Sequence, residues 1–213
     1  SPKQEQIVGI LGPNGIGKST AINLLSGSFT PNLGDWRNPS PQWEDVITTF
    51  PRGELRDYLG LVAEEEVRIA VKPQYIDKLP KIFQGKVLDL LERVDERDEF
   101  SHFSKIMGID HILERNLDVL SGGELQRVAI CATLLKEADV YFFDEPSSYL
   151  DIYERMRMVG VIRELADKGN RVLVVEHDLA ILDVLCDLIH VIYGERSAYG
   201  IFTPPRTTRT AIN

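Results

Sequence analysis

The sequence predicts an α/β domain built on a mainly parallel sheet, and two features lead to this prediction. Short, mostly apolar runs occur at Ile7–Leu11, Val140–Phe143 and Arg171–Val175, and such runs are typical of strands that are covered on both faces. Stretches with helical spacing follow these runs, as expected for repeated strand–helix units. At 213 residues the chain is long enough for one such domain with a small insertion.

The stretch after the first strand fits the pattern G-x-x-x-x-G-K-[ST] and leads into a predicted helix over residues 19–26. Its glycines let the backbone wrap around an anion at the positive end of that helix. Lys18 can reach the β- and γ-phosphates, and the Ser19 hydroxyl is a hard oxygen ligand for Mg²⁺. The alternative is a glycine-rich turn with a surface lysine, which would not need this strand–loop–helix context. The pattern predicts a nucleoside triphosphate site at Asn14, Gly15, Ile16, Gly17, Lys18, Ser19 and Thr20.

Residues 36–66 are predicted to form a helix-loop-helix insert. Pro51 drives Phe50 out of the helical region, so a short turn separates the two helices. The segment carries seven acidic residues against three arginines, which excludes a general RNA-binding patch and favours a solvated helical pair. Arg52 and Arg56 nevertheless lie at the turn, where arginine suits phosphate contacts, so this tip is a candidate nucleic-acid contact.

A further strand is predicted over residues 67–71, and Gln74 follows its end. A glutamine at such a position, taken alone, indicates only a turn. Residues 82–136 are predicted to form a helical region that leads up to and includes the next motif. The apolar stripes of its helices near residues 87–94 and 103–107 are more typical of a core than of a ligand site.

The stretch Leu120–Arg127 combines a helix start with two glycines. Ser121 and Glu124 form an S-x-x-E capping box, which by itself indicates an ordinary well-capped helix. Gly122 and Gly123, however, leave backbone N–H groups unshielded at the positive end of the helix, and this favours a second anion site. One domain with two phosphate-seeking helix starts suggests that one of them serves the nucleotide of another domain.

Two carboxylates, Asp144 and Glu145, end the buried strand at residues 140–143. Ligand sites of parallel sheets lie at the carboxyl ends of strands, where both acids are expected. Asp144 suits a partner of Mg²⁺, and Glu145 suits a base that orients the attacking water. The alternative is an acidic turn after a buried strand.

His177 follows the strand Arg171–Val175 and is expected at the same sheet edge as Asp144. A lone histidine at a strand end is usually structural. This position, however, places the imidazole within reach of a γ-phosphate, so His177 is a second catalytic candidate beside Glu145.

The last part of the chain is predicted to close the sheet and leave it. Strands are expected over residues 189–192 and 198–202, and residues 204–213 are expected to form a linker without a core. Cys131 and Cys186 lie in apolar, helical-looking runs and are expected to be small core residues in a reducing compartment.

Composition excludes several classes of protein. The 33 acidic and 24 basic residues give a net charge of −9, which argues against coating nucleic acid by electrostatics alone. No apolar run approaches 18 residues, and the first residues form no signal peptide, so neither a membrane span nor secretion is expected. A cytoplasmic location is therefore the expectation.

Together these motifs resemble those of the ATP-binding-cassette ATPases, with Walker A at residues 12–20, a Q-loop at Gln74, a signature at residues 120–126, Walker B at residues 140–145, a D-loop at residues 147–151 and a switch histidine at His177. The resemblance implies a cassette over residues 1–203, in which Gln74 and Asp144 join Ser19 at Mg²⁺ and His177 senses the γ-phosphate of ATP. It also implies that Ser121, Gly122, Gly123 and Glu124 clamp ATP held by an opposing cassette. Asp151 would cross the same interface.

Within that superfamily the chain is similar to the first nucleotide-binding domain of the RNase L inhibitor family, the ribosome-recycling ATPases of archaea and eukaryotes. The similarity is carried by residues 12–18, 72–75, 145–151, 175–179 and 197–200, and by the helical pair before Gln74. It implies ATP clamped between two cassettes, hydrolysis that resets the closed state, and a helical pair that faces the small ribosomal subunit. A release or rescue factor is a further implied partner.

The chain departs from the layout of that family. Two cysteines cannot hold iron–sulfur clusters, and one cassette is present where the family has two. We therefore expect an excised domain without an iron–sulfur cluster, bounded by a linker toward an absent second cassette. The aromatic residue that stacks on adenine is expected upstream of this chain.

Two other classes share part of this pattern. A nucleotide-binding subunit of a membrane transporter would carry every ATP motif but would need a groove for a coupling helix. A DNA-repair cassette of the SMC type would need long coiled-coil heptads between Gln74 and Ser121, and the 46 residues in that interval contain no sustained heptad. The insert at residues 36–66 and the Ser147–Tyr149 stretch favour the recycling family.

Overall fold

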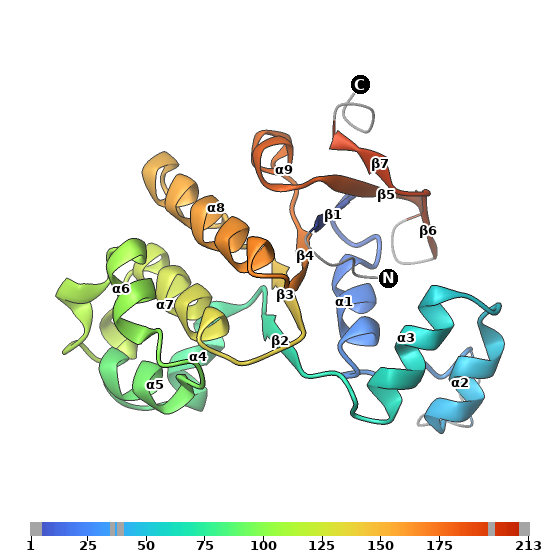
Figure 1. Ribbon diagram of the computed structural model, residues 1–213, viewed down its shortest axis with the longest axis horizontal. Coiled ribbons are helices and arrows are strands. Elements are labelled where there is room, and N and C mark those ends of the chain that lie inside the picture. Colours follow the sequence, from blue (N-terminus) through green and yellow to red (C-terminus); the bar gives the residue numbers. More distant parts are fainter. Residues whose placement is uncertain (1–5, 35–36, 38–40, 196–198, 209–213) are drawn as a thin grey trace.

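A seven-stranded, mostly parallel sheet forms the centre of the computed structural model, which describes residues 6–34, 37, 41–195 and 199–208 (Figure 1). The strand order is β2-β3-β4-β1-β5-β6. Strand β6 pairs with the second half of β5, and β7 pairs with its first two residues. The first five strands in this order are parallel, while β6 and β7 run antiparallel to β5. The strands are β1 (Ile7–Leu11), β2 (Ile69–Lys72), β3 (Val140–Asp144), β4 (Arg171–Val175), β5 (Leu188–Glu195), β6 (Tyr199–Phe202) and β7 (Arg206–Thr207).

The β3 strand shows why its sequence is apolar without interruption. Successive side chains of a strand point to opposite faces, and both faces are covered here. Tyr141 and Phe143 pack into one hydrophobic cluster, whereas Val140 and Phe142 pack into a second one on the other face. All four side chains are fully buried.

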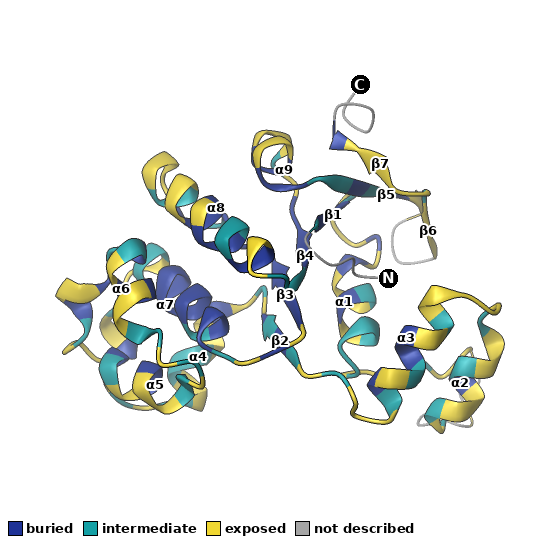
Figure 2. Ribbon diagram, viewed as in Figure 1, coloured by how far each residue is buried: buried dark blue, intermediate teal, exposed yellow. Residues whose placement is uncertain are grey.

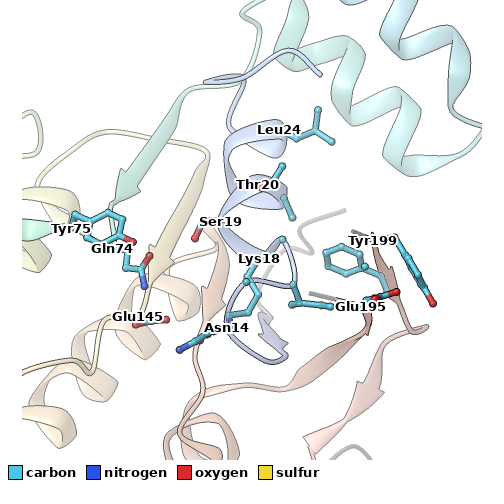
Figure 3. Close-up of a pocket in the computed structure, with 16 residues that line it drawn as sticks. Asn14, Lys18, Ser19, Thr20, Leu24, Gln74, Tyr75, Glu145, Glu195 and Tyr199 are labelled. Atoms are coloured by element: carbon cyan, nitrogen blue, oxygen red, sulfur yellow. The ribbon is translucent and has the colours of Figure 1, made fainter. Parts of the chain in front are cut away.

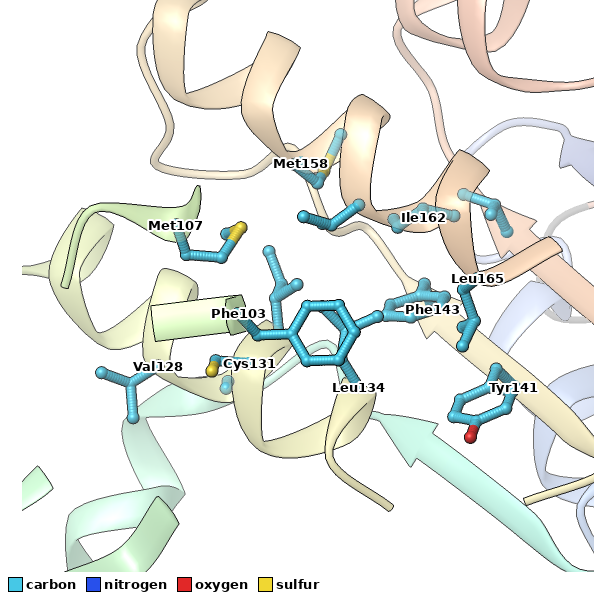
Figure 4. Close-up of a cluster of buried hydrophobic side chains, with 14 of the residues drawn as sticks. Phe103, Met107, Val128, Cys131, Leu134, Tyr141, Phe143, Met158, Ile162 and Leu165 are labelled. Carbon is cyan, nitrogen blue, oxygen red and sulfur yellow. The ribbon is translucent and has the colours of Figure 1, made fainter. Parts of the chain in front are cut away.

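Helices cover both faces of the sheet (Figures 1 and 2). On one face, Ile22 of α1 (Lys18–Leu25) and Leu59 of α3 (Glu54–Ala63) pack into the cluster that contains Phe142. The opposite face is covered by three helices, α7 (Gly122–Leu134), α8 (Ile152–Asp167) and α9 (Leu179–Leu185). Figure 4 shows Ile162 and Leu165 of α8 beside Phe143 and Tyr141 of β3.

The helical region beyond β2 packs against α7. It contains α4 (Leu79–Ile82), α5 (Val87–Val94), α6 (Phe100–Met107) and short 3-10 turns at Ile76–Lys78, Asp110–Ile112 and Leu117–Val119. Phe103 and Met107 of α6 are fully buried beside Val128 and Cys131 of α7 (Figure 4). The two apolar stripes noted in the sequence are therefore part of the core.

The insert consists of α2 (Trp43–Thr49) and α3, joined by the turn at residues 50–53. Gly53 adopts a φ of 153° in that turn, a value that side chains disfavour. The hydroxyl of Tyr58 donates a 2.8 Å hydrogen bond to the carbonyl of Leu25 and so ties α3 to the end of α1. Residues 35–36 and 38–40, at the predicted start of the insert, lie outside the described residues.

The end of the chain differs from the prediction. Strand β5 runs over eight residues instead of the four expected, and Arg206–Thr207 forms β7 on its edge. The buried hydroxyl of Thr208 donates to the carbonyl of Cys186 at 2.8 Å. The first part of the expected linker, residues 204–213, therefore belongs to the sheet, because backbone pairing forms this edge without an apolar pattern. Residues 196–198 and 209–213 lie outside the described part of the chain.

Both cysteines are buried in the core, and burial raises the pKa of each thiol to about 12. This agrees with the expectation that Cys131 and Cys186 are packing residues. Within the described ranges, no helix is long and apolar enough to cross a membrane.

The first prediction concerns the double-sided packing of β3. Replacing Phe143 by Ala leaves a cavity between β3 and α8, so we expect the free energy of unfolding to fall by about 3–5 kcal/mol. Urea unfolding followed by circular dichroism measures this change. Phe202, which is 44% exposed on β6, gives a matched control, since its replacement by Ala should cost less than about 1 kcal/mol. Equal losses for the two variants would contradict this account of the core.

Candidate nucleotide-binding site

A loop between β1 and α1 forms the floor of the site. Gly15 and Gly17 have φ values of 79° and 103°, in the left-handed region that glycine adopts without strain. Gly17 is also the N-cap of α1, so the loop leads directly into the N-terminus of this helix, which carries a partial positive charge. A cavity of ≈ 790 Å³ adjoins this loop, and its lining includes all seven residues 14–20 together with Gln74 and Glu145.

Lys18 is held at the loop by the loop itself. Its Nζ donates to the carbonyls of Gly12 at 2.7 Å and Pro13 at 3.1 Å, and to Oδ1 of Asn14 at 3.2 Å. The residue is only 6% exposed. Burial lowers the pKa of the ammonium, although the carboxylates of Glu145, Asp144 and Glu176 oppose this change. The loop thus fixes a cation at the edge of the cavity (Figure 3).

Ser19 and Asp144 meet across the site. The Ser19 hydroxyl donates a 2.9 Å hydrogen bond to Oδ2 of Asp144, which ends β3 and is 5% exposed. Burial raises the pKa of Asp144, while the hydrogen bond from Ser19 opposes this rise. Ser19 and Gln74 line the cavity, and Asp144 is hydrogen-bonded to Ser19, so the site offers three kinds of hard oxygen donor of the type that Mg²⁺ prefers.

These donors do not make a protein cage for a metal. Within the described ranges, no group of three or more His, Cys, Asp or Glu side chains could hold an ion. A site with few protein ligands is typical of Mg²⁺ that is bound together with nucleotide phosphates and water. The donor set of Ser19, Gln74 and Asp144 therefore fits that ion and that manner of binding.

Glu145 lies between two cavities. It lines the cavity at the loop, and with His177 it also lines a second cavity of ≈ 390 Å³. Nδ1 of His177 lies 4.0 Å from Oε1 of Glu145, and the imidazole is 56% exposed whereas the Glu145 side chain is 12% exposed. The backbone of Glu145 has a φ of 47°, which is strained for a residue with a side chain. Gln74 faces Glu145 in Figure 3.

The signature segment, Ser121–Glu124, caps α7. The Glu124 carboxylate accepts from the Ser121 N–H at 2.7 Å, and Ser121 Oγ accepts from the Glu124 N–H at 3.3 Å. The segment is not among the residues that line the described cavity at the loop. In Figure 1, α7 and α1 lie on opposite sides of β3. The fold therefore does not bring the two predicted anion sites of this chain together.

The two signature glycines also have a packing role that the sequence did not reveal. A Cβ atom on Gly122 would lie 3.1 Å from Cδ1 of Tyr149, and one on Gly123 would lie 3.0 Å from the Tyr149 carbonyl oxygen. Both contacts are tight for a side chain, so glycine allows the Ser147–Tyr149 stretch to approach the start of α7 closely. Tyr149 itself is 72% exposed.

Asp151 serves as the N-cap of α8. Its carboxylate accepts from the Glu154 N–H at 2.8 Å, and Glu154 accepts from the Asp151 N–H at 3.1 Å. Asp151 is exposed and lines neither of the two cavities. A structural role as a helix cap is therefore present, and a contact across an interface stays a prediction.

The arginines of the insert differ from each other. Arg52 is exposed in the turn, whereas Arg56 is half-buried on α3, and its guanidinium donates to the Phe50 carbonyl at 3.5 Å. Both lie far along the chain from the P-loop motif and line neither cavity. The structure thus leaves the predicted nucleic-acid contact as a separate surface.

Sequence reasoning missed a buried charged group under the site. Lys72, at the end of β2, is fully buried, and its Nζ donates to the Asp144 carbonyl at 3.0 Å. Burial lowers the pKa of Lys72 to about 8, against the effect of the carboxylates of Asp144, Glu176 and Glu145. A lysine before Gln74 has no local pattern that distinguishes it from a surface lysine. The wall of the cavity that β5 and β6 form was also not predicted. Glu195 and Tyr199 belong to it (Figure 3), and Phe202 lines the same cavity.

Comparison with known proteins identifies the class to which this site belongs. Residues 1–148 match the family model described as ABC transporter. The chain therefore belongs to the ATP-binding-cassette family, and its α/β fold with a loop before α1 is the nucleotide-binding domain of that family. Nucleotide binding and ATPase function are the properties of this class.

Particular relatives narrow the class further. Translation initiation factor RLI1 of Saccharomyces cerevisiae is 42% identical over 100% of this chain and 36% of its own length. The archaeal ribosome recycling factor aABCE1, solved with the ribosomal stalk protein aP1, superposes with a TM-score of 0.95 at 49% identity, covering 100% of this chain and 41% of that one. A model of ribosome-bound archaeal Pelota and ABCE1 gives a TM-score of 0.90 at 52% identity, covering 100% and 35% of the two chains.

The resemblance to the RNase L inhibitor family is thereby confirmed for the sequence and the fold. The chain spans about a third of the length of the curated relatives that it matches.

The second prediction tests the cation at the loop. Replacing Lys18 by Ala removes the ammonium beside the cavity, and we expect Mg–ATP affinity to fall by about 2–5 kcal/mol, or at least about 30-fold. Isothermal calorimetry on this chain measures the affinity. Lys105, an exposed lysine on α6, provides the control, because its replacement by Ala should leave binding unchanged. Wild-type affinity in a folded Lys18→Ala variant would show that the assignment is wrong.

Proposed function

We propose that this chain is one cassette of a longer, cytoplasmic twin-cassette ATPase that recycles ribosomes. The observation that carries the proposal is the match over the whole chain, α2–α3 insert included, to proteins described as a ribosome recycling factor and as ribosome-bound ABCE1. A transporter subunit would share the Walker A loop (P-loop) at residues 12–20 and the sheet, but it would act at membranes and not on ribosomes.

In the proposed ATP complex, the loop and Lys18 bind the phosphates. The residues at the start of α1 line the cavity, and the Lys18 ammonium is held beside them by the Gly12 carbonyl. Ser19, Gln74 and Asp144 would hold Mg²⁺, which when bound neutralises charge on the β- and γ-phosphates. The Ser19–Asp144 hydrogen bond keeps these two oxygen groups together.

Glu145 is the proposed residue that polarises the attacking water. Its carboxylate lies just beyond Asp144 and is shielded from solvent, which suits a group that accepts a hydrogen bond from water. The water oxygen then bonds to the γ-phosphorus while the bond to the bridging oxygen of ADP breaks, and the proton that the water loses passes to the Glu145 carboxylate and from there to the released phosphate. His177, 4.0 Å from Glu145, is the proposed sensor of the γ-phosphate and the second catalytic candidate.

The site is proposed to be half of a complete one. The signature segment of this chain lies away from its own loop, so Ser121–Glu124 is available to ATP on an opposing cassette. By the same reasoning, the second cassette supplies the missing signature to this chain, and Asp151 contacts it. Closure on two ATP molecules and reopening after hydrolysis would drive the mechanical cycle, with no iron–sulfur cluster held by this segment itself.

The third prediction tests the proposed partner. Full-length protein should sediment with small ribosomal subunits. A non-hydrolysable ATP analogue should raise the bound fraction, because it keeps the two cassettes closed and the closed state is the one that binds the subunit. Adding a release or rescue factor together with intact ribosomes should give split subunits. Recovery of the protein with membranes and not with ribosomes would instead support the transporter alternative.

The fourth prediction concerns the tip of the insert, where Arg52 and Arg56 are the proposed contacts with ribosomal RNA. Arginine at an exposed turn binds phosphates, and each such contact contributes to the salt dependence of binding. We expect Arg52→Glu/Arg56→Glu to weaken association with small subunits and to reduce the slope of log affinity against log salt by about 1–2. ATP binding should persist.

The control for this variant is Arg93→Glu/Lys105→Glu, which makes the same change of charge at exposed positions of α5 and α6. Binding by the tip variant that equals the wild type would assign the insert a structural or protein-contact role. Equal weakening by both double variants would show that overall charge, and not the tip, is responsible.

A further inference from the structure

Three buried side chains from three different elements converge on the turn that carries Glu145. Nζ of Lys72, on β2, donates to the carbonyls of Asp144 at 3.0 Å and Glu145 at 3.4 Å. Nε2 of Gln126, on α7, donates to the carbonyls of Glu145 at 3.0 Å and Pro146 at 2.8 Å. Oε1 of Glu176, just after β4, accepts from the Ser147 N–H at 2.8 Å. All three side chains are 0% exposed.

The turn needs such support because Glu145 is strained. Its φ of 47° lies in the left-handed region, which a residue with a side chain adopts only when its surroundings impose it. The Glu145 N–H donates to the Val175 carbonyl at 2.9 Å, so hydrogen bonds fix the peptide groups on both sides of its Cα atom. With both peptides fixed, the Cα–Cβ bond, along which the side chain leaves the backbone, has a fixed direction.

The side chain of Gln126 shows that these contacts outweigh a local cost. Its Oε1 is buried and has no hydrogen-bond partner among the described residues. An unpartnered amide oxygen in the core is unfavourable, and a methionine or leucine would avoid it. The two hydrogen bonds that Nε2 donates to the Glu145 turn offset the cost of the unpartnered Oε1.

We propose that Lys72 and Gln126 are positioning residues for Glu145, and that Gln126 makes the direction of the Glu145 carboxylate depend on the position of the signature helix α7. The proposal rests on the role proposed above for Glu145. Gln126 lies five residues after Ser121 on the same helix, so a movement of α7 when the signature segment clamps nucleotide on another cassette moves the amide that holds the Glu145 carbonyl. ATP bound to the second cassette would thereby influence the direction of Glu145 in this one.

The test uses Lys72→Met and Gln126→Met in the full-length protein, with the glutamate of the second cassette that corresponds to Glu145 replaced by Gln, so that the second cassette still binds ATP and only this site turns over. Gln126→Met keeps the length of the side chain, Lys72→Met shortens it by one atom, and both remove the donors. We expect the rate of single-turnover ATP hydrolysis to fall about 10- to 100-fold, because a carboxylate that is displaced by about an ångström no longer holds the attacking water in place. Affinity for a non-hydrolysable ATP analogue should stay within about twofold.

A positioning role can be distinguished from a loss of stability by its dependence on Glu145. In a Glu145→Gln background the two substitutions should lower the remaining hydrolysis no further, since the group that they orient is already gone. Thr133→Val is the matched control: Thr133 is a buried polar residue of α7 whose hydroxyl donates to the Ala129 carbonyl at 2.9 Å, away from the turn. It should leave hydrolysis unchanged in either background.

The outcomes separate the two proposals. Wild-type hydrolysis in folded Lys72→Met and Gln126→Met variants, or equal falls with and without Glu145→Gln, would overturn the positioning role and leave Glu145 in place. Full hydrolysis by Glu145→Gln alone would overturn the role of Glu145 itself. If both methionine variants fail to fold, Gln126→Glu decides, because it keeps the length of the side chain and replaces the Nε2 donor by an acceptor; hydrolysis unchanged in that variant would contradict the proposal.

Discussion

The hydrogen bond from Ser19 Oγ to Asp144 Oδ2 is the interaction on which the site depends. It joins two motifs that are 125 residues apart and brings the start of α1 against the end of β3. The bond can form only because β1 and β3 end at the same edge of one parallel sheet, with β4 between them. Two further residues that line the nucleotide cavity are next to this pair in the sequence: Lys18 beside Ser19, and Glu145 beside Asp144.

The apolar strand β3 is what makes that placement rigid. Its four buried side chains interlock with helices on both faces, so the two carboxylates that follow emerge from a fixed base. The strand ends at Asp144, and the chain then makes the strained turn at Glu145. Buried donors from β2 and α7 hold this turn, and through α7 it is linked to the signature segment. The packing of the core therefore fixes the position of the turn that carries the candidate catalytic group.

Local patterns predicted the parts of the fold that depend on local physics. The P-loop needs glycines at fixed spacing, and the capping box at Ser121 involves residues three apart, so both were visible in the sequence. The burial of Lys72 could not be predicted, because its partner carbonyls lie 72 and 73 residues away. Strand β7 was missed because only main-chain pairing defines it, and the contact of Gly122 with Tyr149 depends on the packing of α7 against the loop after β3.

The central claim is that this chain binds ATP by itself but hydrolyses it only when a second signature faces its loop. The most direct measurement is the rate of ATP hydrolysis by this chain as a function of its concentration, with Mg–ATP saturating and the oligomeric state followed by sedimentation. The account predicts weak turnover whose rate per chain rises with concentration, as two chains supply signature segments to each other. Robust turnover per chain that is independent of concentration, from a protein shown to be monomeric, would contradict it.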